Sequence, residues 1–245
     1  MQKIRPVVFF TFLILPLAFL LRSSSFFHEI DISLAYFFND IIRLHPSLQN
    51  TCALLNSKIG NWLYDGLMAL FIVPYIWKGG KEKWLERTVN TLLIVALSFF
   101  CYFLFNRYIT RQLHFKSQSP TGILPDLFNL AEAINWIKVK IHSSNSYPSD
   151  HGSTIFMFIL STYYLMGRKI GALAVVASIP FALPRLLVGA HWASDLFLGS
   201  LPLALFNVAW FFYTPTYKTL LHKILRSIYV INHIRKNLHK IMPAS

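Results

Sequence analysis

Six long apolar segments constrain the fold of this chain more than any other feature of its sequence. They cover residues 6–22, 62–77, 89–106, 152–167, 170–187 and 195–213. Several are near the lower limit of about 17–20 residues for a helix that crosses a bilayer, so we expect some helices to extend past their apolar cores. Charged residues make up only 13% of the 245 residues, which is roughly half the share of a soluble domain. The pattern predicts one all-α, polytopic membrane domain and excludes a soluble globular enzyme, a disordered chain and a disulfide scaffold.

The distribution of Lys and Arg predicts the orientation. The chain carries 23 of them against ten Asp and Glu. In a soluble protein this excess would suggest nucleic-acid binding, but in a membrane protein it gathers in cytoplasmic loops and near anionic lipid. The short connections 78–88 and 167–169 are rich in Lys and Arg, whereas 188–194 contains neither. The positive-inside rule therefore predicts cytoplasmic termini, with 188–194 on the outer face. Lys3 and Arg5 precede the first segment and no A-x-A cleavage pattern follows it, so we interpret it as an uncleaved anchor.

Three further segments have the apolar spacing of a helix without the length of a span. Residues 31–44 begin at a plausible Asp31 cap, and residues 126–141 place apolar side chains on one face. The tail, residues 214–245, is basic and amphipathic. Helices of this kind lie in the membrane interface rather than across it. For the tail, the alternative is a site for a partner protein. We expect all three segments to rest on the lipid surface.

The stretch 147–152 places polar residues at the start of the fourth apolar segment. Pro148 suits the first positions of a helix, and Ser149 or Asp150 can cap it. The free N–H groups of a helix N-terminus bind anions, phosphate above all. His151 would lie beside that anion site with an imidazole that exchanges a proton near neutral pH. Taken alone, the stretch is equally consistent with a capped helix and an interfacial histidine.

The connection 184–195 carries a second polar cluster. His191 and Asp195 are four residues apart, so on a helical turn they share a face. A carboxylate there can hold one imidazole nitrogen as N–H and leave the other free to attack an electrophile. Arg185 offers a planar fork of donors that suits phosphate oxygens. The alternative is an outward-pointing arginine with a His–Asp pair that serves packing. Both clusters fall on the predicted outer face, and together they favour a phosphoryl-transfer site that uses no metal and no cofactor.

The two clusters resemble the second and third signature motifs of the type 2 phosphatidic acid phosphatase (PAP2) superfamily. The matching residues are Pro148, Ser149 and His151 in the second motif, and Arg185, His191 and Asp195 in the third. The resemblance covers roughly residues 60–213 and implies a six-helix catalytic core, followed by the cytoplasmic tail. It also implies that His191 is the nucleophile, that Asp195 fixes its tautomer and that His151 is the general acid.

The sequence departs from the superfamily pattern at three places. Pro184 stands where a serine is usual, and Asp150 replaces a glycine, which puts a carboxylate beside the expected phosphate. The first signature is not present literally. Lys116 is the best replacement for its phosphate-binding cation and Arg111 the second choice, although either could be a solvated loop charge. We expect the phosphate to be held by Arg185, one of these cations and the backbone amides near Ser149, with Asp150 alongside.

These departures resemble the lipid A 1-diphosphate synthase subgroup. The subgroup patterns Lys-x-x-Ser-Pro-Thr, Pro-x-Asp-His-Gly and Pro-Arg-x-x-x-Gly-Ala-His-Trp-x-x-Asp stand here at 116–121, 148–152 and 184–195. The resemblance implies transfer of phosphate from undecaprenyl diphosphate to the 1-phosphate of lipid A, on the periplasmic side of a bacterial inner membrane. One alternative is a lipid phosphatase acting on undecaprenyl diphosphate, phosphatidylglycerol phosphate or lipid A phosphate. The other is a transporter or a non-catalytic membrane scaffold.

Overall fold

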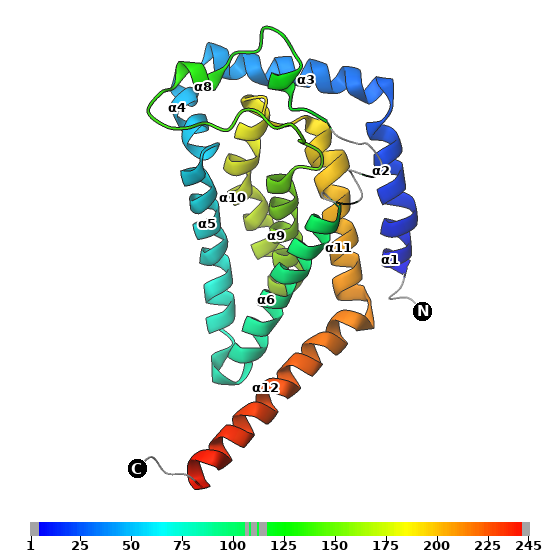
Figure 1. Ribbon diagram of the computed structural model, residues 1–245, viewed down its shortest axis with the longest axis vertical. Helices are drawn as coiled ribbons and strands as arrows, with labels where there is room; N and C mark the ends of the chain where they lie inside the picture. Colours follow the sequence, from blue (N-terminus) through cyan, green and yellow to red (C-terminus); the bar gives the residue numbers. More distant parts are fainter. Residues whose placement is uncertain (1–4, 106–107, 109–111, 113–116, 242–245) are drawn as a thin grey trace.

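The structure, a computed structural model, describes residues 5–105, 108, 112 and 117–241, and every regular element among them is a helix. Six helical segments form the bundle, and three further helices lie at one end of it, which we call the capped end (Figure 1). The bundle consists of α1 (Arg5–Phe9) with η1 (Phe10–Ile14) and α2 (Leu15–Arg22), α5 (Lys58–Trp77), α6 (Gly80–Leu104), α9 (Asp150–Met166), α10 (Arg168–Leu187), and η4 (Asp195–Ser200) with α11 (Leu201–Tyr213). The capped end carries α3 (Ser25–Leu44), α4 (Pro46–Leu55) and α8 (Leu130–Ala133).

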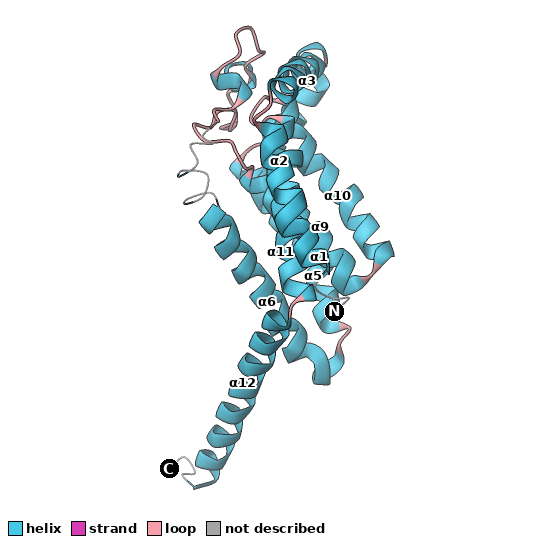
Figure 2. Ribbon diagram, turned by 90° about the vertical axis from the view of Figure 1, so that its right-hand side faces the viewer, coloured by secondary structure: helices cyan, strands magenta, loops and turns pink. Residues whose placement is uncertain are grey.

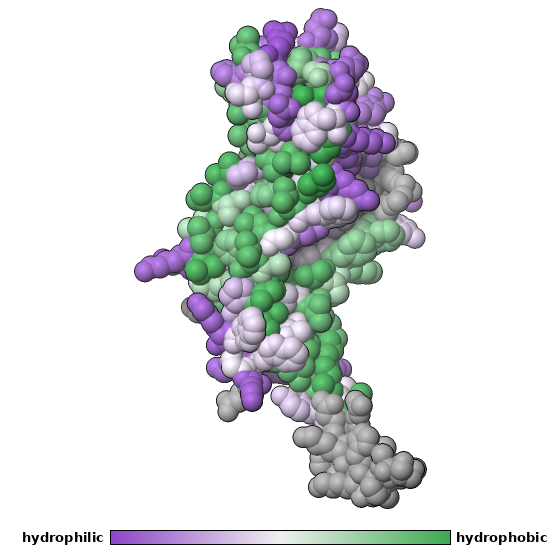
Figure 3. All heavy atoms as spheres, turned by 90° about the vertical axis from the view of Figure 1, so that its left-hand side faces the viewer, coloured by the Kyte–Doolittle hydropathy of each residue, from purple (hydrophilic) through white to green (hydrophobic). Residues whose placement is uncertain are grey.

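Within the described residues, five helical segments are long and apolar enough to cross a membrane. They correspond to five of the six apolar segments in the sequence. The remaining apolar segment, the fourth along the chain, forms α9 as expected. This helix has 17 residues, which gives it a length of about 25 Å at the rise of an α-helix. Large side chains on the bundle surface are mostly exposed, as lipid contact requires; examples are Leu70, Trp77, Phe99 and Val176. Hydrophobic side chains cover the middle of the face in Figure 3, and hydrophilic ones gather at the capped end.

Helix α3 lies across the capped end as an interfacial helix would, but its start differs from the prediction. The helix begins at Ser25, and the side chain of Ser24 caps it by accepting a hydrogen bond from the Phe27 amide. Asp31 is therefore not a cap. It lies one and a half turns inside the helix and is buried, with 3% of its surface exposed. The apolar spacing of 31–44 identified the helix but could not identify its first turn, because Ser24–Phe27 contains an ordinary capping signal followed by aromatic residues.

The prediction of a helix over 126–141 is wrong, since only α8, Leu130–Ala133, is helical there. The apolar residues of this segment nevertheless pack against neighbouring helices. Leu130 is fully buried with Ile42 of α3 and with Cys52 and Ala53 of α4, and Ile134, Ile137 and Ile141 pack against this cluster. The segment follows the contours of α3, α4 and the end of α10, so tertiary packing overrides its helical periodicity. Cys52 is an unpaired filler in this cluster, and burial raises the pKa of its thiol to about 11.

The tail forms α12 (Pro215–Ile241), which leaves the bundle at the end opposite the capped end (Figures 1 and 2). Over its first turns the apolar stripe faces protein. Tyr217 and Leu221 are buried against Val89 and Leu93 of α6 and against Phe211 of α11. The lipid-surface interpretation therefore misses a contact, because the same stripe extends the bundle core. The start of α1 lies at this same end.

Candidate active site

The chemistry-bearing residues of the two motifs meet at the capped end of the bundle. Helix α9 starts there, α10 ends there and η4 begins there (Figure 1). The turn between α10 and η4 depends on Gly189, whose φ of +68° favours glycine, and whose carbonyl accepts a hydrogen bond from the Thr121 amide. A Cβ on this residue would meet the Thr121 methyl at 2.9 Å. The loop that carries the expected first motif is thus packed directly on the turn that carries the third.

The side chains of His191 and Asp195 form a buried pair. His191 is 6% exposed and Asp195 is fully buried. The Nδ1 atom of His191 lies 3.5 Å from a carboxylate oxygen of Asp195 and 3.2 Å from the Ser146 carbonyl oxygen. Because both neighbours accept hydrogen bonds, Nδ1 must carry the proton, and Nε2 keeps its lone pair. The same Asp195 oxygen accepts from the Trp192 amide, which fixes the carboxylate in the turn. The arrangement presents Nε2 as a nucleophile.

The start of α9 is capped as expected, by Ser149. Its hydroxyl accepts a hydrogen bond from the Gly152 amide, and its own carbonyl accepts one from Ser200. The neighbouring carboxylate of Asp150 accepts from the His151 amide at 2.8 Å and contacts His151 Nδ1 at 2.6 Å. Two amides expected to bind phosphate therefore already have side-chain acceptors. An incoming phosphate oxygen must displace Asp150 to reach the His151 amide.

Arg185 is also buried, with 4% of its surface exposed. It donates from a terminal nitrogen to Oδ1 of Asn61, at 2.8 Å. The same oxygen lies 3.0 Å from Nε2 of His151. A cavity of about 200 Å³ is lined by all three of these side chains, together with Asp65 and Thr154. Arg185 and His151 thus face one space. It is large enough for a tetrahedral phosphoryl group, whose volume is ~70 Å³ or less, compared with about 30 Å³ for a water molecule in the liquid.

Two ionisable residues from the first helices reach the third motif. Asp31 of α3 accepts hydrogen bonds from both the amide and the hydroxyl of Ser194, the residue before Asp195. Burial raises the pKa of the Asp31 carboxyl, while the hydrogen bonds from Ser194 act in the opposite direction. Arg22, at the end of α2, lies 3.9 Å from the second oxygen of Asp195 and donates to the Ser117 hydroxyl. These contacts tie the N-terminal helices to the turn that carries His191 and Asp195.

The structure brings together five of the eight site residues that the sequence predicted. They are His191, Asp195, His151, Asp150 and Arg185, with Ser149 beside them as a helix cap. Lys116 and Arg111 lie outside the described residues. Sequence reasoning missed Asn61, Asp31, Arg22 and Ser146. A buried Asp in an apolar helix was a usable signal for Asp31, whereas Asn61 and the Ser146 carbonyl carry no motif.

Three ligand-type atoms of Asp150, His151 and His191 lie within 4.8 Å of one another. Asp150 is already engaged with the ring and the amide of His151, and its Oδ1 is 4.0 Å from Nε2 of His191. These contacts explain why the three residues lie close together, because both histidines face the Asp150 carboxylate. We therefore assign no metal to the cluster. Activity without a metal stays a prediction.

A buried His–Asp pair, a second histidine and a buried arginine lie together at one end of an all-helical bundle, an arrangement that can support phosphoryl transfer. Comparison with known proteins shows the family to which the chain belongs. The PAP2 superfamily profile matches residues 87–220, more than half of the chain, and the protein belongs to this superfamily. The lipid A 1-diphosphate synthase of Escherichia coli (strain K12) is similar to it, with 27% identity over 196 residues that cover 79% of each chain. No solved structure matches the chain significantly. The protein is a membrane enzyme that acts on lipid phosphates as a phosphatase or phosphotransferase.

Proposed function

We propose that this enzyme transfers the terminal phosphate of undecaprenyl diphosphate to the 1-phosphate of lipid A, through a phosphohistidine at His191. The observation that carries the proposal is that the two histidines of the site differ in the hydrogen-bond partners of their ring nitrogens. Nε2 of His191 has a free lone pair, whereas both ring nitrogens of His151 face acceptors. The similarity to the E. coli lipid A 1-diphosphate synthase supports the choice of lipid A as acceptor.

The first step joins Nε2 of His191 to the terminal phosphorus of the donor. The bond from that phosphorus to the bridging oxygen breaks, and His151 protonates the departing oxygen. Arg185 stabilises the equatorial oxygens as charge moves onto them. In the second step the 1-phosphate oxygen of the acceptor attacks the phosphorus, and the N–P bond breaks. The acceptor enters with one proton on its phosphate and passes that proton to His151 as it attacks, which restores both histidines.

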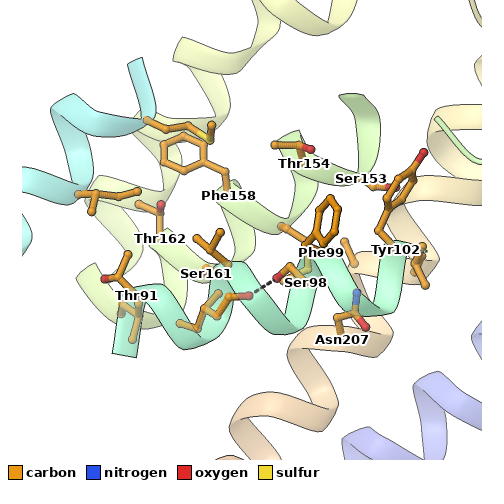
Figure 4. A pocket seen from close by; sticks show the side chains of 18 of the residues that line it. Thr91, Ser98, Phe99, Tyr102, Ser153, Thr154, Phe158, Ser161, Thr162 and Asn207 are labelled. Atoms are coloured by element: carbon orange, nitrogen blue, oxygen red, sulfur yellow. Dashed lines mark hydrogen bonds between the residues drawn. The ribbon is translucent and has the colours of Figure 1, made fainter. Parts of the chain in front are cut away.

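An apolar cavity beside the site offers space for a lipid chain. It has a volume of about 250 Å³ and lies between α6 and α9, with α5 and α11 at its margins (Figure 4). Thr154, one turn after His151, lines both this cavity and the one that holds Arg185. The polar end of a lipid could therefore lie against Arg185 while its chain runs down the cavity, toward the other end of the bundle. A free sugar phosphate would leave this cavity unused.

The distribution of charge supports a site on the periplasmic side. The α5–α6 and α9–α10 connections carry basic residues, among them Lys78, Lys81, Arg168 and Lys169, and they lie at the end opposite the site (Figure 1). The start of α1 and the whole of α12 are at that same end. The positive-inside rule assigns it to the cytoplasm. We therefore place the active site at the periplasmic face of a bacterial inner membrane, with both termini cytoplasmic.

The test uses purified enzyme in detergent, with undecaprenyl diphosphate labelled in its terminal phosphate and a chelator present. Lipid A is either included or left out. His191→Ala is the inactive control. His222→Ala, which alters an exposed histidine of α12 at the far end of the bundle, is the matched one. We expect label on lipid A, with little free phosphate, in the wild type and in His222→Ala.

Three other outcomes contradict parts of the proposal. Free phosphate released regardless of lipid A would show a phosphatase and remove the acceptor from the proposal. Turnover that disappears with the chelator would contradict chemistry without a metal. No turnover of this donor above the His191→Ala background would exclude undecaprenyl diphosphate as the donor lipid.

A further inference from the structure

Asn61 lies in the first turn of α5, outside the region 87–220 that matches the superfamily. Its side chain is nevertheless in the centre of the site. One atom, Oδ1, contacts a terminal nitrogen of Arg185 at 2.8 Å and Nε2 of His151 at 3.0 Å. These contacts join positions 124 and 90 residues apart. One amide therefore links the cation of the third motif to the histidine of the second.

The identity of the Asn61 atom follows from its partners. A guanidinium only donates hydrogen bonds, so the amide atom that faces Arg185 must be the oxygen rather than the NH2 group. Because the same oxygen faces Nε2 of His151, that nitrogen must carry a proton in order to make a hydrogen bond. Arg185 thus sets the orientation of Asn61, and Asn61 sets the proton position on His151.

The other ring nitrogen is held by Asp150. The distance of 2.6 Å between Nδ1 and the carboxylate is that of a hydrogen bond with one shared proton. The His151 amide donates to the same oxygen, which favours the ionised carboxylate, and a free carboxyl is a stronger acid than an imidazolium. The proton therefore stays on the ring. Other charged or titratable groups that face His151 are Arg185 from α10 and His191 from the turn, with Asp65 of α5 lining the same cavity.

We propose that Asn61 is a positioning residue that keeps a proton on Nε2 of His151 and aims it at the oxygen that leaves phosphorus. This role rests on the phosphohistidine chemistry of the proposed function. When the N–P bond to His191 forms and the P–O bond breaks, the electron pair of that bond goes to the leaving oxygen. The proton on Nε2 moves to this oxygen, and His151 is left neutral with its Nδ1 proton still held by Asp150. Arg185 uses one terminal nitrogen for Asn61, and its other N–H groups can bind the equatorial oxygens of the phosphate in the same step.

A comparison of leaving groups tests this role. Undecaprenyl diphosphate releases a phosphate monoester, a weak base whose departure depends little on a proton. Undecaprenyl phosphate releases an alcohol, whose departure depends strongly on one. Turnover of each lipid by the full-length enzyme is measured with lipid A present as acceptor, as consumption of the donor lipid. We expect Asn61→Leu to lower kcat on the monophosphate about 100-fold and on the diphosphate less than about 10-fold. Asn61→Asp retains an acceptor and should recover most of the monophosphate activity.

A double-mutant cycle separates this role from a structural one. If Asn61 acts through His151, the combination of Asn61→Leu with His151→Gln should be no slower on the monophosphate than His151→Gln alone. Asn50→Leu, at an exposed position of α4 that contacts only Trp136 among the hydrogen bonds of the described residues, is the matched control and should leave both rates unchanged. Equal losses by Asn61→Leu on the two lipids would overturn the proposal.

A measurement that needs no turnover distinguishes failure of this inference from failure of the proposed function. Nitrogen-15 spectra of histidine-labelled enzyme report the protonation of each ring, and His151→Gln identifies the signals of His151. We expect Nε2 of His151 to carry a proton in the wild type. In Asn61→Leu, this nitrogen should lose its proton at a lower pH than in the wild type. A wild-type spectrum with an unprotonated Nε2 would overturn the inference whatever the donor lipid proves to be.

Discussion

The two histidines of the site are each paired with an aspartate, but the pairs are built differently. His191 and Asp195 lie in a turn of one short segment and are closed off from solvent. His151 and Asp150 are adjacent in sequence at the start of a helix, and the carboxylate is 43% exposed. The first pair leaves one ring nitrogen without a proton, whereas the second gives both nitrogens acceptors. A nucleophile needs a fixed lone pair and an acid needs an available proton, so under the proposed mechanism the same two residue types serve opposite roles.

The comparison also separates two parts of the chain. The nucleophilic pair takes its hydrogen bonds from residues 146–195, within the region that defines the superfamily. The proposed acid, His151, contacts Asn61, and the residue before Asp195 contacts Asp31; both Asn61 and Asp31 precede that region. Under the proposed mechanism, the family region contains the reacting groups, and residues of earlier helices contact them.

His191→Ala should have the largest effect, because it removes the atom that forms the covalent bond. We expect turnover to fall on the order of 10⁴-fold or more, with the free energy of unfolding little changed. Acid-quenched reactions with labelled donor measure the phosphoenzyme directly. Labelled protein should appear in the wild type and accumulate in the absence of acceptor. Label retained on His191→Ala would show that the nucleophile is another residue.

Asp195→Asn tests how the nucleophilic pair fixes its tautomer. The substitution leaves the Ser146 carbonyl as a partner for Nδ1 of His191, so the tautomer is only partly released. We therefore expect a loss of about 100-fold in kcat, smaller than that of His191→Ala. Steady-state kinetics measure it, with KM for the donor little changed. A loss as large as that of His191→Ala would mean that the carboxylate does more than orient the ring.

Asp150→Gly restores the small residue usual in the superfamily and tests the acid pair. Removal of the carboxylate should lower kcat about tenfold, since Nδ1 of His151 loses its acceptor. It should also lower KM for the donor several-fold, because a negative charge no longer competes with phosphate for the His151 amide. Asp150→Asn should have kcat and KM values between those of the wild type and Asp150→Gly. If KM rises in Asp150→Gly, then Asp150 assists phosphate binding instead of competing with it.

The ratio of free phosphate to transferred phosphate, measured in the same assay, shows whether the carboxylate also restrains hydrolysis.

Asp31→Asn should have the smallest effect and concerns stability. Burial raises the pKa of Asp31 in the folded protein above its value of 3.8 in the unfolded chain, so the ionised form costs the folded state some stability. This cost is absent well below pH 3.8 and grows as the pH rises through the folded pKa. Asn cannot ionise and still accepts from the Ser194 amide. Thermal unfolding in detergent should show that this part of the pH dependence is lost. Asp40→Asn, at a half-exposed position of the same helix, is the control. An unchanged pH profile in Asp31→Asn would show that the pKa of Asp31 is not raised by folding.

Sequence patterns were reliable where a local rule governs the structure. Runs of apolar residues located five helices that can cross a membrane, together with α9, because hydrophobicity over about 20 residues decides whether a helix can lie in lipid. The four-residue spacing of His191 and Asp195 was sufficient to predict their contact. The same reasoning failed over 126–141. There, helical periodicity is satisfied by packing of Leu130 and Ile137 against α3 and α4 without a helix.

By itself, then, the sequence determined the membrane-spanning class of the chain, the helices of the bundle and most of the residues that meet in the candidate site, since each follows from residues close together in the chain. Only the tertiary structure decided which distant groups complete the site. Asn61 reaches His151 and Arg185, and Asp31 reaches Ser194, across separations of 90 to 163 residues. No local pattern encodes such pairings, because they depend on how whole helices pack and which ends they bring together.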